Sequence, residues 1–210
     1  MIASLKKILE VVNLGEKLKY ELRHSWLSNG RQESVAEHTW RVSLMAMLLE
    51  PYLREEIDTL KLLKMIIIHD LVEAEAGDIP AFDTLTDSSV KDQKAIREVK
   101  AIKKIRDTLG GDLGHDFYNL WFEFEGKATY ESKVANALDK LEAQIQHNES
   151  DISTWLEIEH QMSFMMDKHV YFDENLIMLK DIIEDEALEK LLQAGINANE
   201  LKKSVHARTY

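Results

Sequence analysis

The sequence lacks cysteine altogether and has few residues that interrupt a helix. Its 210 residues include no cysteine, two prolines and eight glycines. Without cysteine, a disulfide framework and a thiolate metal site are both excluded. No apolar stretch reaches the ~20 residues that a membrane-spanning helix needs, and the N-terminal residues do not form a secretory signal. We therefore expect a protein of a reducing compartment, located in the cytoplasm, with no membrane partner.

An excess of positive charge is also absent, since the formal net charge is −12. Duplex nucleic acid binds through basic surfaces, so we expect no such partner. The lysines between residues 91 and 104 have acidic neighbours, and we interpret them as one exposed helix face: Lys91, Lys94, Lys100, Lys103 and Lys104. A content of 45% hydrophobic and 30% charged residues is typical of a folded domain. The length suits a single core.

Apolar residues recur at spacings of three and four, which indicates helices. No segment alternates convincingly at period two. We predict an all-α fold, a single helical bundle over residues 1–210. The expected helices span about 5–22, 35–49, 59–76, 88–109 and 129–147, and further segments at about 151–168, 173–183 and 185–194 complete the bundle within about 151–195. Other segments are expected to be a polar connection at 23–31, a short aromatic segment at 117–124 and a loosely held tail from about 197.

Local sequence signals mark several helix ends. The segment Ser34-Val35-Ala36-Glu37 fits a capping box, in which the serine oxygen and the glutamate carboxylate each accept a backbone N–H. Asp58 is expected to cap the next helix, and Gly77 to end it. Ser88 or Ser89 is expected to cap the following helix, whose predicted inward residues are Ile96, Val99, Ile102 and Ile105.

Polar side chains within the apolar stripes form a candidate metal site. His69-Asp70 lies in the apolar run of residues 65–72, and a buried carboxylate is costly unless it is paired or binds a metal. His38 lies in the apolar stripe of the 35–49 helix, and Asp139 is one position from the stripe of the 129–147 helix. Two imidazoles and two carboxylates suit a transition metal better than calcium. We expect one divalent metal ion: manganese, cobalt, iron, nickel, zinc, copper or magnesium.

Two further acids lie close to this set. Glu73 follows His69 by four residues and Asp70 by three, so it shares their helix face. Asp78 follows just beyond the end of that helix. A carboxylate beside a metal can take a proton from an attacking water or hold that water in line. Metal-assisted hydrolysis is therefore the chemistry that this group of residues indicates.

The order His38, His69-Asp70 and Asp139 resembles the H…HD…D pattern of the HD-domain phosphohydrolase superfamily. Over about residues 5–150 the flanking motifs are similar to its 5′-deoxynucleotidase branch, which has bacterial and eukaryotic members: Glu33-Ser34-Val35-Ala36-Glu37-His38, His69-Asp70-Leu71-Val72-Glu73-Ala74, Gly77-Asp78-Ile79 and Leu138-Asp139-Lys140-Leu141-Glu142. The resemblance implies a single HD-domain helical bundle, one divalent metal held by the four residues, phosphate-ester hydrolysis and a homodimer.

The resemblance also implies roles for residues outside the metal set. Arg23 matches an arginine that contacts the substrate phosphate, and its planar guanidinium suits phosphate oxygens. Glu73 and Asp78 match acidic positions around the attacking water and the sugar, which makes them the candidate catalytic residues. Trp26 is a candidate for binding substrate because aromatic rings line ligand sites, with core packing as the alternative.

The activity that the resemblance implies is hydrolysis of deoxyribonucleoside 5′-monophosphates to deoxynucleoside and phosphate. Two alternatives stay open. One is another HD phosphohydrolase, acting on a cyclic nucleotide, a polyphosphorylated nucleotide or a small organic phosphate. The other is a non-catalytic helical protein in which the metal only stabilises the bundle. The extra acids Glu73 and Asp78 argue against this second alternative, since a structural metal needs only its ligands.

Overall fold

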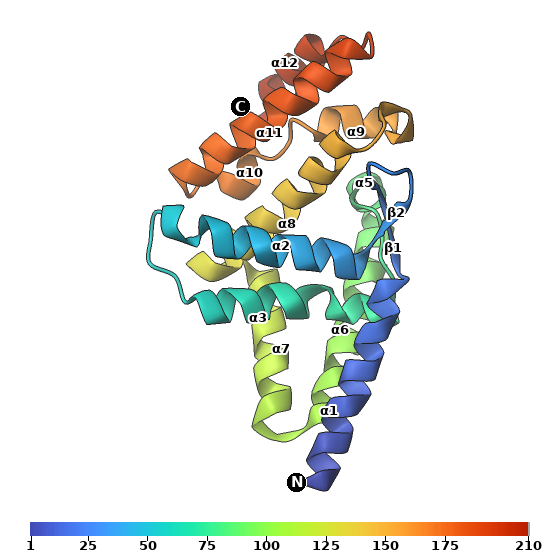
Figure 1. The fold of residues 1–210 in the computed structure, drawn as a ribbon, viewed down its shortest axis with the longest axis vertical. Coiled ribbons are helices and arrows are strands. Elements are labelled where there is room, and N and C mark those ends of the chain that lie inside the picture. Colours follow the sequence, from blue (N-terminus) through green and yellow to red (C-terminus); the bar gives the residue numbers. More distant parts are fainter. Residues whose placement is uncertain (210) are drawn as a thin grey trace.

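Helices follow one another along nearly the whole chain, of which the computed structural model describes residues 1–209 (Figure 1). The first elements are α1 (Ile2–Gly15), η1 (Glu16–Lys19), β1 (Leu22–Trp26), β2 (Gln32–Ser34), α2 (Val35–Leu49), η2 (Glu50–Tyr52), α3 (Thr59–His69), η3 (Asp70–Val72), α4 (Glu73–Ala76) and α5 (Ala81–Thr86). They are followed by α6 (Ser88–Leu109), α7 (Gly111–Gly126), α8 (Tyr130–Glu149), η4 (Ile152–Thr154), α9 (Glu157–Met162), α10 (Asp167–Val170), α11 (Glu174–Gln193) and α12 (Ala198–Thr209). The predicted all-α class is confirmed.

Three helices that are distant in sequence form the centre of the molecule. The helices α2, α3 and α8 pack against one another (Figure 1). Their buried apolar residues share one core, which includes Val42, Ala46, Leu62, Met65, Ile66, Val134, Leu138 and Leu141. Burying one such aliphatic side chain contributes roughly 1.5–3 kcal/mol. This packed centre gives the polar residues on the same three helices fixed positions.

Side-chain caps set the points at which these central helices begin. At α2 the backbone N–H of Glu37 donates to Ser34 Oγ, and the N–H of Ser34 donates to the Glu37 carboxylate, so the predicted capping box is confirmed. At α3 Asp58 accepts the N–H of Lys61 at 2.9 Å, as expected. At α8 Thr129 forms a second capping box, with Ser132.

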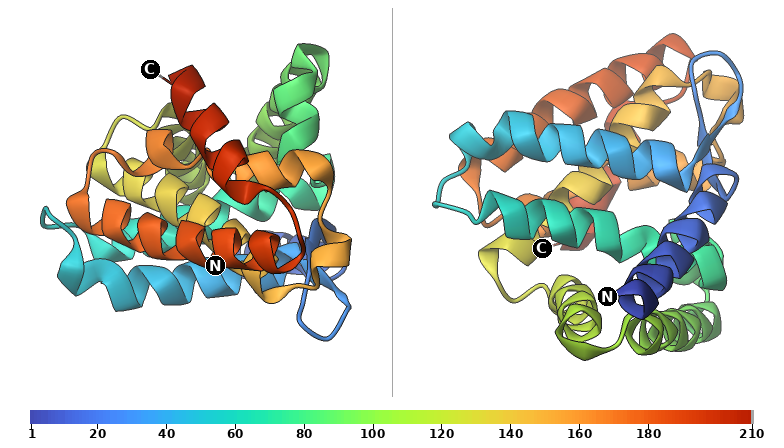
Figure 2. Two further views of the ribbon diagram at one scale, coloured as in Figure 1. Left: turned by 90° about the horizontal axis from the view of Figure 1, so that it is seen from above. Right: turned by 60° about the horizontal axis from the view of Figure 1, so that its bottom comes forward.

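The remaining helices extend the centre in two directions (Figure 2). On one side α6 packs against α1 and α7, and the N-terminus lies at that end. On the other side α11 packs against α8, and α12 packs against α9 and α11. None of the helices within residues 1–209 is both long and apolar enough to cross a bilayer.

A short hairpin replaces part of the connection that was predicted at 23–31. Strands β1 and β2 pair antiparallel, with Leu22 opposite Ser34 and Trp26 opposite Gln32. Gly30 has a φ of 83°, a left-handed conformation that suits glycine at the turn. The register shifts between Leu22 and Trp26, so a regular two-residue alternation does not appear in the sequence. The pattern therefore predicts a connection where the backbone forms two strands.

The C-terminal third departs most from the predicted helix boundaries. Helix α11 is continuous over Glu174–Gln193, where two helices were expected. The expected helix at 151–168 is divided into η4, α9 and α10. The tail that was expected to be loosely held contains α12, because Ala198 and Val205 are buried in a second apolar cluster with Trp155, Phe164, Ala187 and Leu191. Tertiary burial thus stabilises helix in a polar sequence.

Three further expectations differ from the structure around α6 and α7. The aromatic segment 117–124 belongs to α7, which is 16 residues long and places Trp121 and Phe124 in the core. Asp87, rather than a serine, caps α6 by accepting the N–H of Ser89 at 2.7 Å. Ile102 and Ile105 are buried as predicted, but Ile96 is 68% exposed because it lies on the outer face of α6.

Candidate metal centre and phosphate site

The pair His69-Asp70 lies where α3 ends and the backbone tightens into the short helix η3. Both residues are buried, at 6% exposure each. Ile66 and Ile68, which precede them, are in the core and fix the end of α3. The apolar run therefore carries an imidazole and a carboxylate into the interior, as the sequence predicts.

Four polar side chains, from α2, α3, η3 and α8, converge at this point. His38 of α2 places Nε2 3.0 Å from Asp139 Oδ1 of α8 and 3.8 Å from Asp70 Oδ2. His69 Nε2 lies 2.9 Å from Asp70 Oδ1 and 3.9 Å from Asp139 Oδ1. Ligand atoms about 2.1 Å from one metal are separated by about 3.0 Å at right angles and about 3.4 Å at tetrahedral angles. His38, His69 and Asp139 each offer one ligand atom within 4.8 Å of the others, so these three residues can bind one divalent metal ion, and Asp70 lies next to them.

The outer ring nitrogens of both histidines are already engaged. His69 Nδ1 lies 2.6 Å from the carbonyl oxygen of Ile66, to which it can donate its N–H. His38 Nδ1 is hydrogen-bonded to the carboxylate of Glu142. Donation of N–H from Nδ1 leaves the lone pair on Nε2 directed at a metal. Consistent with this, His69 Nε2 is buried and has no hydrogen-bond partner among the described residues.

The two carboxylates of the cluster are held in the same way. Thr39 Oγ1 lies 3.3 Å from Asp70 Oδ2 and shares its proton with the nearer carbonyl oxygen of Val35, at 2.9 Å. Lys140 Nζ donates to Asp139 Oδ2 at 2.8 Å, which leaves Oδ1 facing the histidines. Each of the four candidate ligands therefore has a partner that fixes its orientation.

The electrostatics of the cluster call for a positive charge at its centre. Burial and Arg23 lower the pKa of His38, but the carboxylates of Glu142 and Asp139 outweigh them and raise it to about 10. Burial raises the pKa of Asp70, but the adjacent His69 and the nearby His38 hold it well below its usual range. When no metal is bound, a protonated His38 supplies the positive charge that the carboxylates favour. A divalent cation at the same point would supply it instead.

The candidate catalytic acids lie immediately after this cluster. Glu73 begins α4 and is buried, with Oε2 lacking a hydrogen-bond partner among the described residues. Burial, followed by the charges of Asp70 and Asp78, raises the pKa of Glu73 well above its usual value. Gly77 ends α4 with a φ of 76°, and the next residue, Asp78, donates its N–H to Glu21 Oε1 at 3.0 Å. Burial also raises the pKa of Asp78, and Asp70 adds to this, against Arg23 and Lys94.

Arg23 of strand β1 interacts electrostatically with the same group of acids. Burial lowers its pKa, but the charges of Asp70, Asp139 and Asp78 outweigh burial and raise it. Its Nε lies 3.3 Å from Glu33 Oε2, at the end of the guanidinium that is nearest the chain. Glu33 is itself buried, which raises its pKa to about 7. The hairpin thus carries a cation to the metal cluster.

Trp26 lies at the far end of β1 and is half-buried. Its ring packs edge to face on that of His24, with the centroids 4.8 Å apart. Its carbonyl oxygen accepts a hydrogen bond from Gln146 Nε2 at 2.7 Å. None of these contacts, within the described part of the chain, joins Trp26 to the metal cluster or to the two candidate catalytic acids.

Several residues around the cluster received no role in the sequence analysis. Glu142 follows Asp139 by three residues on the same face of α8 and contacts His38; this spacing could have indicated it. Arg41 Nε donates to Glu142 Oε1 at 2.6 Å. Lys94 was predicted to be on an exposed helix face, which is wrong: its Nζ lies 4.0 Å from Glu73 Oε1, because α6 packs on α4. The periodicity of the sequence could not have predicted this contact, because it depends on how two helices pack.

The helical fold and the buried cluster of histidines and carboxylates define a class of helical proteins with a candidate metal centre. Comparison with known families identifies the family. A family model described as an HD domain matches residues 15–178, and the chain therefore belongs to the HD-domain family.

Named relatives and solved structures are similar to most of the chain. The 5′-deoxynucleotidase HDDC2 of Dictyostelium discoideum is 32% identical over 79% of this chain and 86% of its own length. The human protein of the same name is 29% identical over 77% of this chain and 74% of its own length. A crystal structure of a predicted metal-dependent phosphohydrolase from Magnetospirillum magnetotacticum has a TM-score of 0.75 and 29% identity, over 90% of this chain and 97% of that one.

Proposed function

We propose that the protein is a metal-dependent phosphomonoesterase that hydrolyses deoxyribonucleoside 5′-monophosphates to deoxynucleoside and phosphate. The observation that carries the proposal is the convergence of His38, His69, Asp70 and Asp139, with buried acids and an arginine beside them. The substrate class is supported by relatives named 5′-deoxynucleotidase that are similar to most of the chain.

The four converging residues would hold one divalent metal, of the kind listed from the sequence. A bound metal supplies Lewis-acid stabilisation of phosphate oxygens and lowers the pKa of water. Arg23 binds the substrate phosphate: it stays charged because the acids of the cluster raise its pKa, and its Nε is paired with Glu33 at 3.3 Å. That cation also offsets the negative charge that develops on phosphate oxygens in the transition state.

Glu73 and Asp78 manage the protons of the reaction. A water oxygen forms a bond to phosphorus, the bond from phosphorus to the 5′-oxygen breaks, and Glu73 takes the proton that the water loses. Burial and neighbouring acids raise the proton affinity of Glu73, which suits a general base. The 5′-oxygen leaves as a hydroxyl, with its proton supplied by Asp78 or passed on from Glu73; otherwise Asp78 hydrogen-bonds the sugar, and Trp26 borders the nucleoside.

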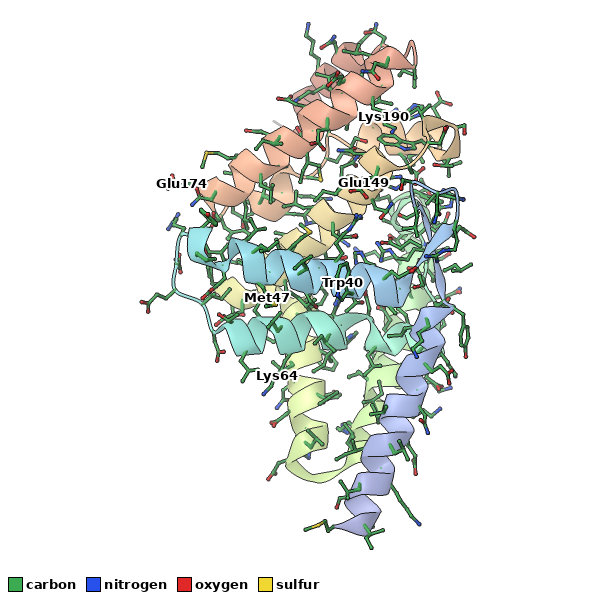
Figure 3. The ribbon with its side chains drawn as sticks, in the orientation of Figure 1. Trp40, Met47, Lys64, Glu149, Glu174 and Lys190 are labelled. Atoms are coloured by element: carbon green, nitrogen blue, oxygen red, sulfur yellow. The ribbon has the colours of Figure 1, made fainter. Side chains whose placement is uncertain are left out.

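The further sequence expectations remain part of the proposal. We propose a cytoplasmic protein that forms one domain over residues 1–210 and assembles as a homodimer. The burial of α12 residues against α11 supports the single domain. An apolar stripe on the outer face of α2 supports a dimer; it consists of Trp40, Leu44, Met47 and Leu48. Trp40 and Met47 are labelled in Figure 3. The molar mass in solution, measured by light scattering, tests the dimer.

Phosphate release across a substrate panel tests the function. The metal-stripped protein would be given manganese, cobalt, magnesium or zinc separately, together with deoxyribonucleoside and ribonucleoside monophosphates or cyclic nucleotides. We expect metal-dependent release from the deoxyribonucleoside monophosphates. Turnover of cyclic nucleotides instead would support a different HD phosphohydrolase. No turnover with any metal, together with unfolding on metal removal, would support a structural metal.

A further inference from the structure

Lys94 is carried to the candidate catalytic acids by the packing of α6 on α4. Its Nζ lies 4.0 Å from Glu73 Oε1 and 3.5 Å from Glu98 Oε1, and its side chain is 28% exposed. On the same helix, Arg97 Nη1 donates to the carbonyl oxygen of Ala76, the last residue of α4, at 3.3 Å. This contact holds the two helices together next to the acids, so the position of Lys94 is built into the fold.

The ion pairs of Lys94 are loose compared with others around the site. Lys140 approaches Asp139 to 2.8 Å, and Arg41 approaches Glu142 to 2.6 Å. Contacts of 3.5–4.0 Å leave the ammonium donors of Lys94 free to turn toward an anion. Burial lowers the pKa of Lys94, but Glu98 and Glu73 outweigh burial and raise it, so the group stays charged.

Lys94 and Arg23 approach the same acids from different elements. Both cations interact electrostatically with Asp70 and Asp78. Both also lower the pKa of Glu73. Arg23 comes from strand β1 and Lys94 from α6, so two separate elements bring positive charge to these acids. Carboxylates repel a phosphate dianion, and a second cation beside them offsets that repulsion.

We propose that Lys94 is a second phosphate-binding residue, which holds the substrate phosphate together with Arg23. This inference rests on the proposed function, since it assigns the ammonium group to the phosphate of that substrate. A charge-assisted hydrogen bond from an ammonium to a phosphate oxygen contributes about tenfold in affinity. Because the ammonium acts as a point charge, a guanidinium at the same position should retain part of the effect.

The test compares three variants with the manganese-loaded wild-type protein. Lys94→Met removes the charge and keeps the length of the side chain, and Lys94→Arg keeps the charge. Lys91→Met is the matched control, because Lys91 is an exposed lysine three residues earlier on α6. The readouts are the dissociation constant of inorganic phosphate, KM and kcat for a deoxyribonucleoside monophosphate, and the affinity for Mn²⁺. Thermal unfolding checks the fold, and Lys94→Gln replaces Lys94→Met if the latter does not fold.

We expect Lys94→Met to weaken phosphate binding about tenfold and to raise KM, with the Mn²⁺ affinity not reduced. Lys94→Arg should lie between it and the wild type, and Lys91→Met should match the wild type. Unchanged phosphate binding in Lys94→Met, with only kcat lowered, would overturn the proposal, because Lys94 would then act only through Glu73. If the wild type binds phosphate but hydrolyses no monophosphate, the proposed function fails, while phosphate binding by the variants still decides the role of Lys94.

Discussion

Replacing Glu142 by glutamine should weaken metal binding without disrupting the fold. The carboxylate of Glu142 accepts the Nδ1 proton of His38 and also pairs with Arg41 Nε at 2.6 Å. Burial raises the pKa of Glu142, but His38 and the two arginines Arg23 and Arg41 outweigh it and lower the pKa. The carboxyl group of Glu142 is therefore ionised. By accepting the Nδ1 proton it makes Nε2 of His38 more basic, and so a stronger ligand for a metal.

The expected magnitude follows from the loss of one buried charge-assisted hydrogen bond. Such a bond contributes about 1.5–3 kcal/mol, which corresponds to roughly 10- to 150-fold in an equilibrium constant. Partners in the second coordination shell of a metal typically contribute 10- to 100-fold in metal affinity. Because glutamine keeps the shape of glutamate and can still accept one hydrogen bond, we expect the loss to be about tenfold.

Titration calorimetry with Mn²⁺ measures the effect directly. The matched control is Glu149→Gln, because Glu149 also pairs with Arg41, at 2.7 Å, but is half-exposed and contacts Arg41 rather than His38. We expect Glu149→Gln to bind Mn²⁺ like the wild type. A dissociation constant for Glu142→Gln within twofold of the wild-type value, in a folded protein, would refute the orienting role of Glu142.

Three further predictions concern the site and the fold. Asp70→Ala should abolish metal-dependent phosphate release while leaving the helical circular dichroism intact, and full activity would contradict its assignment as a ligand. Arg23→Ala should lower kcat/KM by about 10²–10³, as expected for loss of a transition-state donor, and an unchanged value would exclude the phosphate role. Burial, with His24 and Arg23, lowers the pKa of His147 to about 4 from 6.5, so the unfolded state takes up the proton first and stability falls as the pH drops from 6.5 toward 4. Chemical denaturation should show about 2 kcal/mol less acid destabilisation between pH 7 and 4.5 in His147→Gln than in the wild type.

The four candidate ligands were accessible from the sequence because each is a polar residue at or beside an apolar helix face. His38 and Asp139 lie at or next to core positions of α2 and α8, and His69-Asp70 ends a buried run. A buried polar group needs a partner, which makes such positions conspicuous. The helix starts at Ser34 and Asp58 could also be predicted from the local sequence, since each cap accepts the N–H of a residue three positions later.

The features that the sequence did not reveal depend on contacts between distant segments. Lys94 has the same sequence surroundings as the exposed lysines of α6, and only the packing of α4 distinguishes it. Helix α12 has a polar sequence, and it is ordered by burial of Ala198 and Val205 against residues 155–191. Strand β1 pairs irregularly with β2, so the alternation that marks a strand is missing. In each case the local structure is stabilised by tertiary contacts, and the preferences of the residues in the segment itself do not determine it.

The distribution of satisfied and unsatisfied polar atoms distinguishes a catalytic site from a structural one. On the outer side of the cluster, the Nδ1 atoms of His38 and His69 and the Oδ2 atom of Asp139 are hydrogen-bonded. On the inner side, His69 Nε2 and Glu73 Oε2 are buried without hydrogen-bond partners among the described residues. A metal ion would satisfy His69 Nε2 alone. The proposed function supplies a partner for Glu73 Oε2, namely the attacking water, and a purely structural metal site would not.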